Sequence, residues 1–258
     1  MSDSEIVDDV PEGVEFLKLV RRLENKCDRK TSARRPRMGK RAPECYERLG
    51  TILSILDRES SCFWECNGGD HIIEYLCGRT ANCSRAALRL MQMGFYDESL
   101  VLIRSVGEIA NLIVLFKLKP GTLDDWQQCT RQQRLRTYSP VKVRLLLEAG
   151  GEKPPISEER YSRLCEVAAH VHPGTVPQAH NPLRRPVCAG IYQEIGFLIC
   201  LNELALASTL VASFASLLIV KSKPLRKRIT QEAAALARSL GGANIIDIDE
   251  YYKAVSAA

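Results

Sequence analysis

The chain has 258 residues, of which 45% are hydrophobic and 26% are charged, and its formal net charge is +5. This composition is typical of a globular protein with a sizeable core, and it excludes a predominantly disordered chain. Aromatic residues are few, while Ala and Leu are plentiful, which favours helix. The ten cysteines are scattered and no secretory signal precedes them, so we expect reduced thiols and a cytoplasmic location.

The charge changes sign near the N-terminus. Residues 2–15 carry six acidic side chains and no basic one, whereas residues 21–41 carry ten Lys and Arg against Glu24 and Asp28. We expect residues 1–42 to form an extension, with a short helix from about Glu12 to Asn25 and then a basic, partly disordered linker. Such a segment suits either a phosphate-binding arm or a solvated linker.

Residues 43–258 predict a single all-α domain, a bundle of long antiparallel helices. Pro43 opens an amphipathic helix, and after a glycine-containing loop Asp70 is placed to cap a second helix that Gly94 ends. The segment that follows, residues 95–116, is apolar almost all the way round. It is therefore expected to be the central, buried helix of the bundle.

The second half of the chain continues the helical pattern. An amphipathic segment covers residues 122–137, and shorter helices are expected over residues 140–149 and from Ser157 to about Val171. A long helix is expected from about Pro186 to Lys221, before a final amphipathic helix. Its uncharged stretch is seventeen residues long and diluted by Ser and Ala, whereas a membrane span needs about twenty strongly apolar residues, so we expect no membrane span.

Three polar side chains interrupt the central apolar helix on one face. Arg104, Glu108 and Asn111 lie at i, i+4 and i+7. Charged side chains are almost never fully buried unless they are paired. This face therefore points at a partner, a cavity or a site, or else Arg104 and Glu108 form a buried ion pair that fixes helix packing.

Three of the four histidines lie within one short stretch, EVAAHVHPGTVPQAHNP, which holds His170, His172 and His180. A neutral imidazole near an Arg and a Glu is suited to general acid–base chemistry at neutral pH. A histidine at the end of a helix also caps carbonyl groups and suits the helix dipole. Both interpretations stay open on the sequence.

A group of cysteines and one histidine approaches a zinc-knuckle spacing: Cys62, Cys66, His71, Cys77 and Cys83. The last three of them fall within a predicted helix, where residues six positions apart face different ways. A closed tetrahedral site needs all its ligands to converge. We therefore expect no metal, no cofactor and inert cysteines, and neither a P-loop nor a dinucleotide fingerprint is present in the sequence.

Several motifs occur together in order: GDHIIEYLCGR, GFYDESLVLIRSVGEIANLIVLF, Trp126, YSPVKVRLLLE and the stretch from Tyr161 to Pro173 that ends in HVHP. This set resembles a group of bacterial all-helical proteins that looks like a distant branch of the HEPN superfamily. The resemblance covers roughly residues 70–215 and leaves out the basic N-terminal segment.

The resemblance implies a dimeric helical bundle, because HEPN domains are usually homodimers. Many of them are RNases of toxin–antitoxin, abortive-infection and CRISPR systems, with an R-x4-6-H motif at the dimer interface. Arg163 and His170 fit this spacing as R-x6-H. The motif departs from the family pattern in two ways, since Leu164 follows the arginine where a polar residue is usual, and the motif ends a helix instead of beginning one.

Two functions follow as expectations. The first is a HEPN-like, metal-independent RNase of bacterial stress or phage defence, with RNA as substrate and an antitoxin or other protein as a further partner. In it a histidine would take the 2′-hydroxyl proton and an arginine would stabilise the phosphorane. The second is a non-catalytic helical binding or scaffold module with a structural polar cluster. The candidate catalytic residues are His170, His172, Arg163, Arg104, Glu108 and Asn111.

Overall fold

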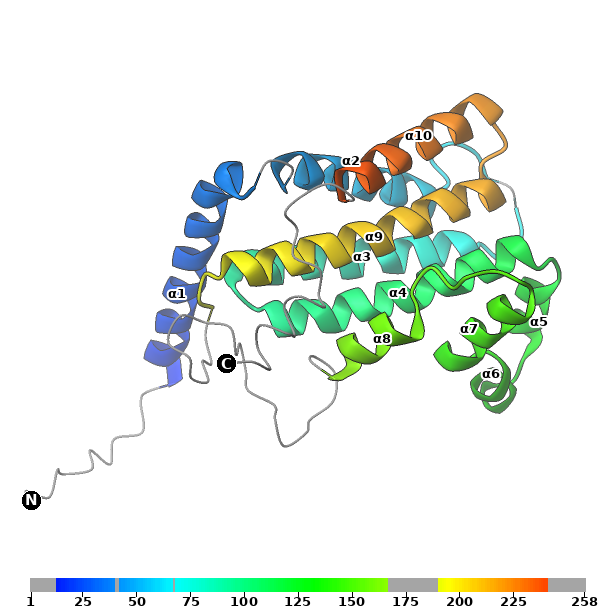
Figure 1. The fold of residues 1–258 in the computed structure, drawn as a ribbon, viewed down its shortest axis with the longest axis horizontal. Helices are drawn as coiled ribbons and strands as arrows, with labels where there is room; N and C mark the ends of the chain where they lie inside the picture. Colours follow the sequence, from blue (N-terminus) through cyan, green and yellow to red (C-terminus); the bar gives the residue numbers. More distant parts are fainter. Residues whose placement is uncertain (1–12, 40–41, 67, 167–189, 241–258) are drawn as a thin grey trace, which may run out of the picture.

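The computed structural model describes residues 13–39, 42–66, 68–166 and 190–240. These residues form ten α-helices and one 3-10 helix, and none of them lies in a strand. The expected all-α class is confirmed (Figure 1). The helices are α1 (Gly13–Arg34), η1 (Arg35–Arg37), α2 (Ala42–Ser60), α3 (Ile72–Met93), α4 (Tyr96–Leu118), α5 (Thr122–Gln128), α6 (Arg131–Thr137), α7 (Pro140–Ala149), α8 (Glu158–Leu164), α9 (Glu194–Ile219) and α10 (Lys223–Leu240).

The core lies where α4 and α9 pack against each other and against α3. Both α4 and α9 are apolar over most of their circumference, so they bury side chains in every direction, as a central helix must. α2 and α10 cover one side of this core, while α5 to α8 lie on the other (Figure 1). The expected central helix over residues 95–116 is therefore confirmed as α4.

The two central helices, α4 and α9, run in the same direction, although helices that follow one another in the chain, such as α3 and α4, run in opposite directions. At one end the Tyr96 hydroxyl accepts a hydrogen bond from the Gln193 N–H at 2.9 Å. At the other end Lys117 donates to the carbonyl oxygen of Leu217 at 3.5 Å. The ring of Tyr96 packs so closely on Gly196 that a Cβ added to this glycine would lie 2.8 Å from the ring. A larger residue at Gly196 would therefore push the two helices apart.

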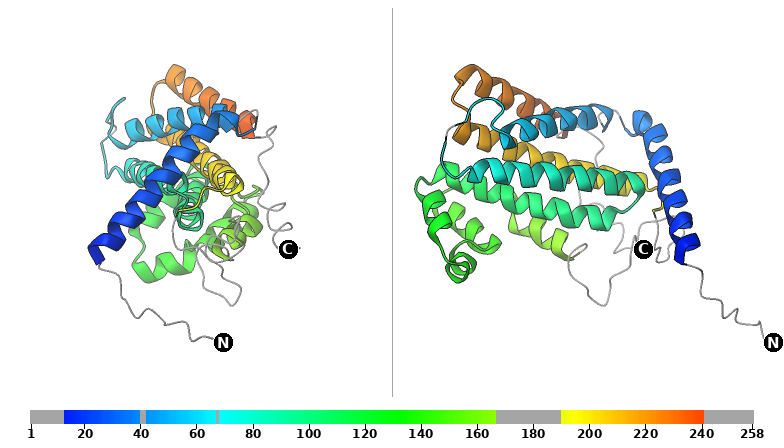
Figure 2. Two further views of the ribbon diagram at one scale, coloured as in Figure 1. Left: turned by 90° about the vertical axis from the view of Figure 1, so that its left-hand side faces the viewer. Right: turned by 180° about the vertical axis from the view of Figure 1, so that it is seen from behind.

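The N-terminal segment differs from the expected linker, because α1 continues past Asn25 to Arg34 and is followed by η1. Its C-terminal half is held on α3, where the Thr31 hydroxyl donates to the Gln92 carbonyl oxygen at 3.1 Å and Asp28 pairs with Arg89 at 2.9 Å. These tertiary contacts stabilise helix in a stretch whose charge pattern predicted none. Figure 2 shows that the other half of α1 projects beyond the bundle.

Further helix boundaries differ from the sequence-based expectation, and α9 begins at Glu194 instead of near Pro186. The single segment expected over residues 122–137 is two helices, because Thr130 caps α6 in a capping box with Gln133. Asp70 does not cap α3, since its carboxylate accepts a hydrogen bond from Gln127 at 2.7 Å, and the N-cap residue is His71.

By length and composition, α4 and α9 are each able to cross a membrane. In the structure 67% of the apolar window of α4 and 78% of that of α9 is buried against other helices. Buried core helices of globular proteins share these properties with membrane spans.

Candidate functional site

Arg104 and Glu108 do come together on α4, and they meet Tyr161 of α8. The guanidinium group of Arg104 donates to the Tyr161 hydroxyl and pairs with the Glu108 carboxylate at 2.9 Å, while its Nε donates to the Cys165 Sγ at 2.9 Å. The Tyr161 hydroxyl in turn donates to Glu108 Oε1 at 2.8 Å. The three side chains close a ring of polar contacts between α4 and α8, with Cys165 at its edge.

The contacts within this polar cluster raise the pKa of both Tyr161 and Arg104. Partial burial and the hydrogen bond to Glu108 raise the pKa of Tyr161 to about 12, against the lowering effect of Arg104. Burial lowers the pKa of Arg104, but the hydrogen bond to Tyr161 and the charge of Glu108 outweigh it, and the net pKa shift is upward. At neutral pH the phenol is therefore protonated and the guanidinium is charged.

Asn111 does not join this cluster but forms hydrogen bonds with the backbone of Ile156. Its side-chain amide donates to the carbonyl oxygen of Ile156, and its Oδ1 accepts from the N–H of Ile156, both at 2.9 Å. Asn111 is buried, so both hydrogen bonds are shielded from water. This arrangement fixes the residue that leads into α8.

The other predicted site residues are not brought to the cluster within the described part of the chain. Arg163 forms an ion pair with Glu159 one turn earlier on α8. His170 and His172 lie outside the described residues, as does His180. The structure therefore places four of the six candidate catalytic residues, and of those it joins only Arg104 and Glu108 directly.

Sequence analysis missed the residues that complete the contact between α8 and the bundle. Arg160 binds Glu203 of α9 through two hydrogen bonds of 2.6 Å, and Glu203 is buried. Arg144 of α7 is also buried, and its guanidinium carbon lies 4.8 Å from the Tyr161 ring centroid. The one available signal was Glu203, an acid in an otherwise apolar helix, which requires a buried cation as partner.

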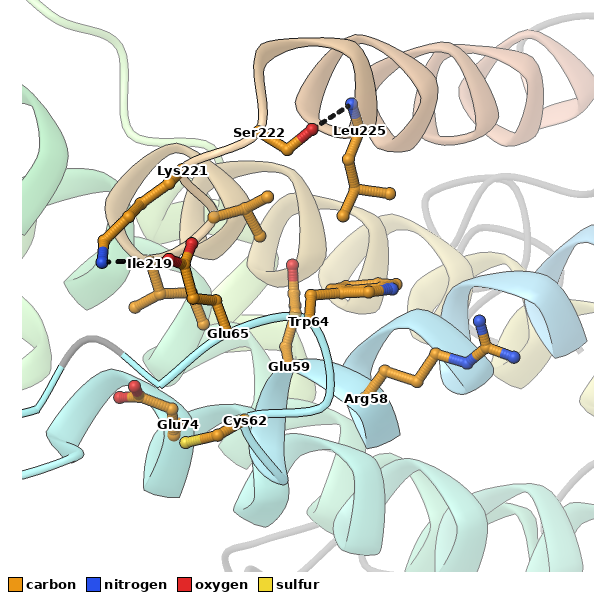
Figure 3. Close-up of a pocket in the computed structure, with 11 residues that line it drawn as sticks. Arg58, Glu59, Cys62, Trp64, Glu65, Glu74, Ile219, Lys221, Ser222 and Leu225 are labelled. Atoms are coloured by element: carbon orange, nitrogen blue, oxygen red, sulfur yellow. Dashed lines mark hydrogen bonds and ion pairs between the residues drawn. The ribbon is translucent and has the colours of Figure 1, made fainter.

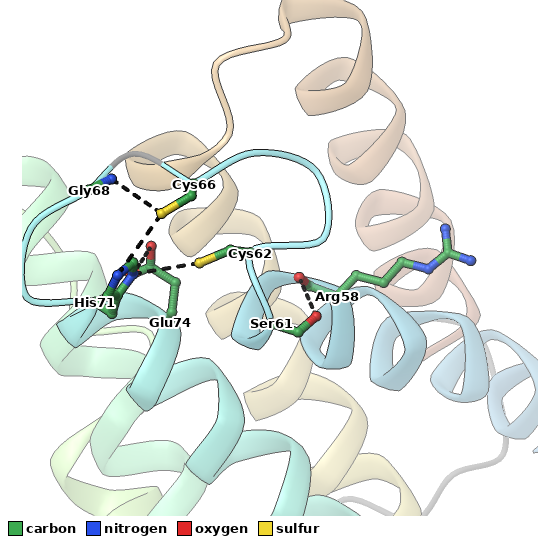
Figure 4. Close-up of polar contacts among 7 residues, drawn as sticks. All are labelled: Arg58, Ser61, Cys62, Cys66, Gly68, His71 and Glu74. Atoms are coloured by element: carbon green, nitrogen blue, oxygen red, sulfur yellow. Dashed lines mark hydrogen bonds and ion pairs between the residues drawn. The ribbon is translucent and has the colours of Figure 1, made fainter.

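A second polar cluster lies in the loop between α2 and α3. The Cys62 Sγ is 3.5 Å from Nδ1 of His71, the Cys66 Sγ is 4.0 Å from Nε2 of the same ring, and Glu74 Oε1 is 3.5 Å from Nδ1 (Figure 4). His71 was expected inside a helix, but it precedes α3 with a φ of 53°, which turns its ring back toward the loop. Cys77 and Cys83 lie further along α3, away from the ring, so the expectation that the five residues do not converge holds for these two.

Cavities of very different size adjoin this loop. A small cavity of about 30 Å³ is lined by Cys62, Glu74, Trp64 and the buried Glu59, and Figure 3 shows Cys62 and Glu74 side by side at one end of it. An open groove of about 330 Å³, lined in part by Gly68 and His71, reaches the other side of the cluster from solvent.

Comparisons with protein-family models, with curated proteins and with solved structures find no match for this chain. The resemblance to HEPN domains therefore rests on the sequence motifs alone.

Proposed function

We propose that the chain is a non-catalytic helical scaffold that binds partner molecules, and that the polar stripe of α4 holds α8 in place. One observation carries this proposal: Arg104, Glu108 and Asn111 all direct their hydrogen bonds to α8 or to the residue that precedes it. A catalytic stripe would direct at least one of these groups at open solvent.

The protonation of the cluster supports the same conclusion. A general base at neutral pH needs a pKa near the working pH. The pKa of Tyr161 is raised to about 12, and Arg104 stays charged, so neither group is available to accept a proton. Glu108 already accepts hydrogen bonds from both of them.

The purified full-length chain, incubated with labelled single-stranded RNA and with tRNA, tests this function. The matched variant is His170→Ala/His172→Ala, which removes both histidines of the RNase hypothesis. We expect equal, background levels of cleavage from the two proteins. Cleavage by the wild type that disappears in a folded double variant, with an unchanged melting temperature, would overturn the scaffold and establish the nuclease.

The RNase of bacterial stress or phage defence is the second candidate, and one observation favours it. The side chains of Arg104 and Glu108 keep 21% and 33% of their exposed area, so a phosphate could still approach them. Their neighbour Cys165 lies five residues before His170 in the chain. RNA and an antitoxin-like protein are the partners of this alternative, whereas a cytoplasmic location, supported by the scattered cysteines of the sequence, suits both candidates.

The binding surface that we assign to the scaffold is the apolar face of α1, and the occupant is the same face of a second copy. Phe16, Leu19 and Leu23 are exposed at i, i+3 and i+7. This face continues the one that buries Cys27 and Thr31 against α3, so it is aligned for packing but extends beyond the bundle (Figure 2). A two-fold pair needs only one such surface, and two-fold dimers are the commonest oligomers.

Sedimentation velocity of the wild type and of Phe16→Ser/Leu19→Ser tests the dimer. The matched control is Val14→Ser, because Val14 is equally exposed but lies on the opposite side of α1. We expect a dimer for the wild type and the control, and a monomer for the double variant. A monomeric wild type at micromolar concentration would refute self-association through α1.

A further inference from the structure

The loop between α2 and α3 places two thiols and an imidazole around one point, and the carboxylate of Glu74 lies beside the imidazole. Ligand atoms of Cys62, Cys66 and His71 all lie within 4.8 Å of one another. In a tetrahedral zinc site, with Zn–S near 2.3 Å and Zn–N near 2.1 Å, a sulfur and a nitrogen ligand are about 3.6 Å apart. The distance from Cys62 Sγ to His71 Nδ1 is 3.5 Å, so this pair already has the spacing of two ligands.

From this geometry we propose that Cys62, Cys66 and His71 bind a zinc ion, with Glu74 as the fourth ligand. The four residues have the spacing C-x3-C-x4-H-x2-E, and Nδ1 of His71 is the nitrogen that faces both Cys62 and Glu74. The Cys66 Sγ is 4.0 Å from Nε2, the other ring nitrogen, so binding requires Cys66 to move toward the Nδ1 side of the ring.

The backbone of the loop is shaped for these ligands. Cys62 and His71 are the two non-glycine residues with a left-handed φ in the described part of the chain, and both have a φ of 53°. That conformation is unfavourable for an L-residue, and here it turns both side chains toward each other. In addition, the Gly68 N–H donates to the Cys66 Sγ at 3.5 Å, a hydrogen bond that stabilises negative charge on a sulfur ligand.

Glu74 is the carboxylate that fits the fourth position. It is only 5% exposed, and its Oε1 faces His71 Nδ1 at 3.5 Å. A buried carboxylate requires a compensating cation, which a divalent ion supplies. The nearby acids have other contacts, since Glu65 pairs with Lys221 at 3.3 Å and Asp70 accepts from Gln127 at 2.7 Å.

The other cysteines of α3 are excluded as ligands by their surroundings. Cys77 is fully buried and donates to Glu59 Oε2 at 3.7 Å. Cys83 lies more than a helical turn beyond Cys77 and packs against the hydrophobic core. The site is thus formed by the loop and the first turn of α3, and the open groove beside His71 and Gly68 gives an ion access from solvent.

Zinc fits this donor set better than the alternatives. Two thiolates and an imidazole are borderline-soft ligands that select zinc over magnesium or calcium. Four protein ligands make a closed, structural site, which would clamp the loop onto α3 and, through Glu65 and Lys221, onto the end of α9. The competing use of the two thiols is a disulfide between Cys62 and Cys66.

The test uses the full-length chain purified without chelator. Metal analysis is expected to give one zinc per chain, and removal followed by titration against a chromophoric chelator gives the affinity. Cobalt added to the metal-free protein is expected to show the intense visible bands of a tetrahedral site and a thiolate charge-transfer band. Cys62→Ser, Cys66→Ser, His71→Gln and Glu74→Gln are each expected to weaken zinc binding by at least about tenfold.

The matched control is Cys83→Ser, which removes a partly buried thiol of α3 without touching the cluster. Its zinc affinity is expected to equal that of the wild type. Wild-type protein that binds no zinc in the titration, a Cys62–Cys66 disulfide found by mass spectrometry in freshly purified protein, or an equal loss of affinity in Cys83→Ser would each overturn the proposal. The cobalt spectrum of the wild type decides the matter even if a ligand variant fails to fold.

Discussion

Asn111 of α4 and the backbone of Ile156 form a closed pair of hydrogen bonds, each of 2.9 Å. The side-chain amide replaces the backbone partner that Ile156 would have in a sheet, so a loop residue is satisfied inside the bundle. The side chain of Ile156 packs against Gly107, one turn earlier on α4. α4 thereby fixes the position from which α8 starts.

Replacing Asn111 by Leu is expected to lower the free energy of unfolding by at least about 2 kcal/mol, because it leaves a buried N–H and a buried carbonyl group unsatisfied. Urea denaturation of the purified variant measures this loss. Ser105→Ala is the control on the same helix. Among the described residues the Ser105 hydroxyl donates to the Val101 carbonyl of its own helix alone, at 3.4 Å, so its loss should cost less than about 0.5 kcal/mol. Equal losses in the two variants would contradict the assignment.

The sequence predicted the long helices well because their signals are local. The apolar periodicity of α2 and α4 and the glycine that ends α3 depend on the residues of each segment alone, and Gly94 indeed has a φ of 87°. The length of α1 was underestimated, because Cys27 and Thr31 are buried only by contact with α3. The run of basic residues in this stretch gives no sign of that contact.

The same limit applies to the candidate sites. The i, i+4, i+7 spacing of Arg104, Glu108 and Asn111 predicted a shared face, but not that α8 covers it. For the cluster of Cys62, Cys66 and His71, the sequence-based argument assumed that His71 lies inside a helix, and this assumption was wrong. His71 precedes α3 instead of lying inside it, and a single left-handed residue redirects its ring toward Cys62.

The ion pair of Arg160 and Glu203 is expected to be a strong contact between α8 and α9. Glu203 is 2% exposed, so Arg160→Leu leaves an uncompensated buried carboxylate and should cost about 3–5 kcal/mol in the free energy of unfolding. Arg85→Leu is the control, because the side chains of Arg85 and its partner Asp57 are 65% and 68% exposed and such surface pairs contribute about 1 kcal/mol or less. Chemical denaturation of both variants measures the free energy of unfolding. Similar losses of stability would show that the buried Arg160–Glu203 pair contributes no more than a surface pair.

Glu59 is expected to make the stability of the protein fall as the pH rises above the ordinary range of a glutamate carboxyl. Burial raises the pKa of its carboxyl well above the usual range, against a smaller lowering by Cys77. The folded state therefore holds a proton that the unfolded state releases, so stability falls as pH rises through the folded pKa. At about pH 5, Glu59→Gln should be no more stable than the wild type. Toward about pH 9 the stability of the variant should rise relative to that of the wild type. The control Glu65→Gln, at the surface, should show a constant difference; a constant difference for Glu59→Gln would refute the prediction.

Tyr161 is likewise expected to make the stability of the protein fall as the pH rises, but at alkaline pH. Burial and Glu108 raise the pKa of its hydroxyl to about 12, so the folded state keeps the proton between about pH 10 and 12 while the unfolded state loses it. Stability should therefore decline over this interval, and the decline should be shallower in Tyr161→Phe, which also loses about 1 kcal/mol at neutral pH with the hydrogen bond to Glu108. Denaturation midpoints at a series of pH values measure both effects. Tyr75→Phe, which alters an exposed phenol, should keep the wild-type slope, and an unchanged slope in Tyr161→Phe would show that this hydroxyl is not held by the cluster.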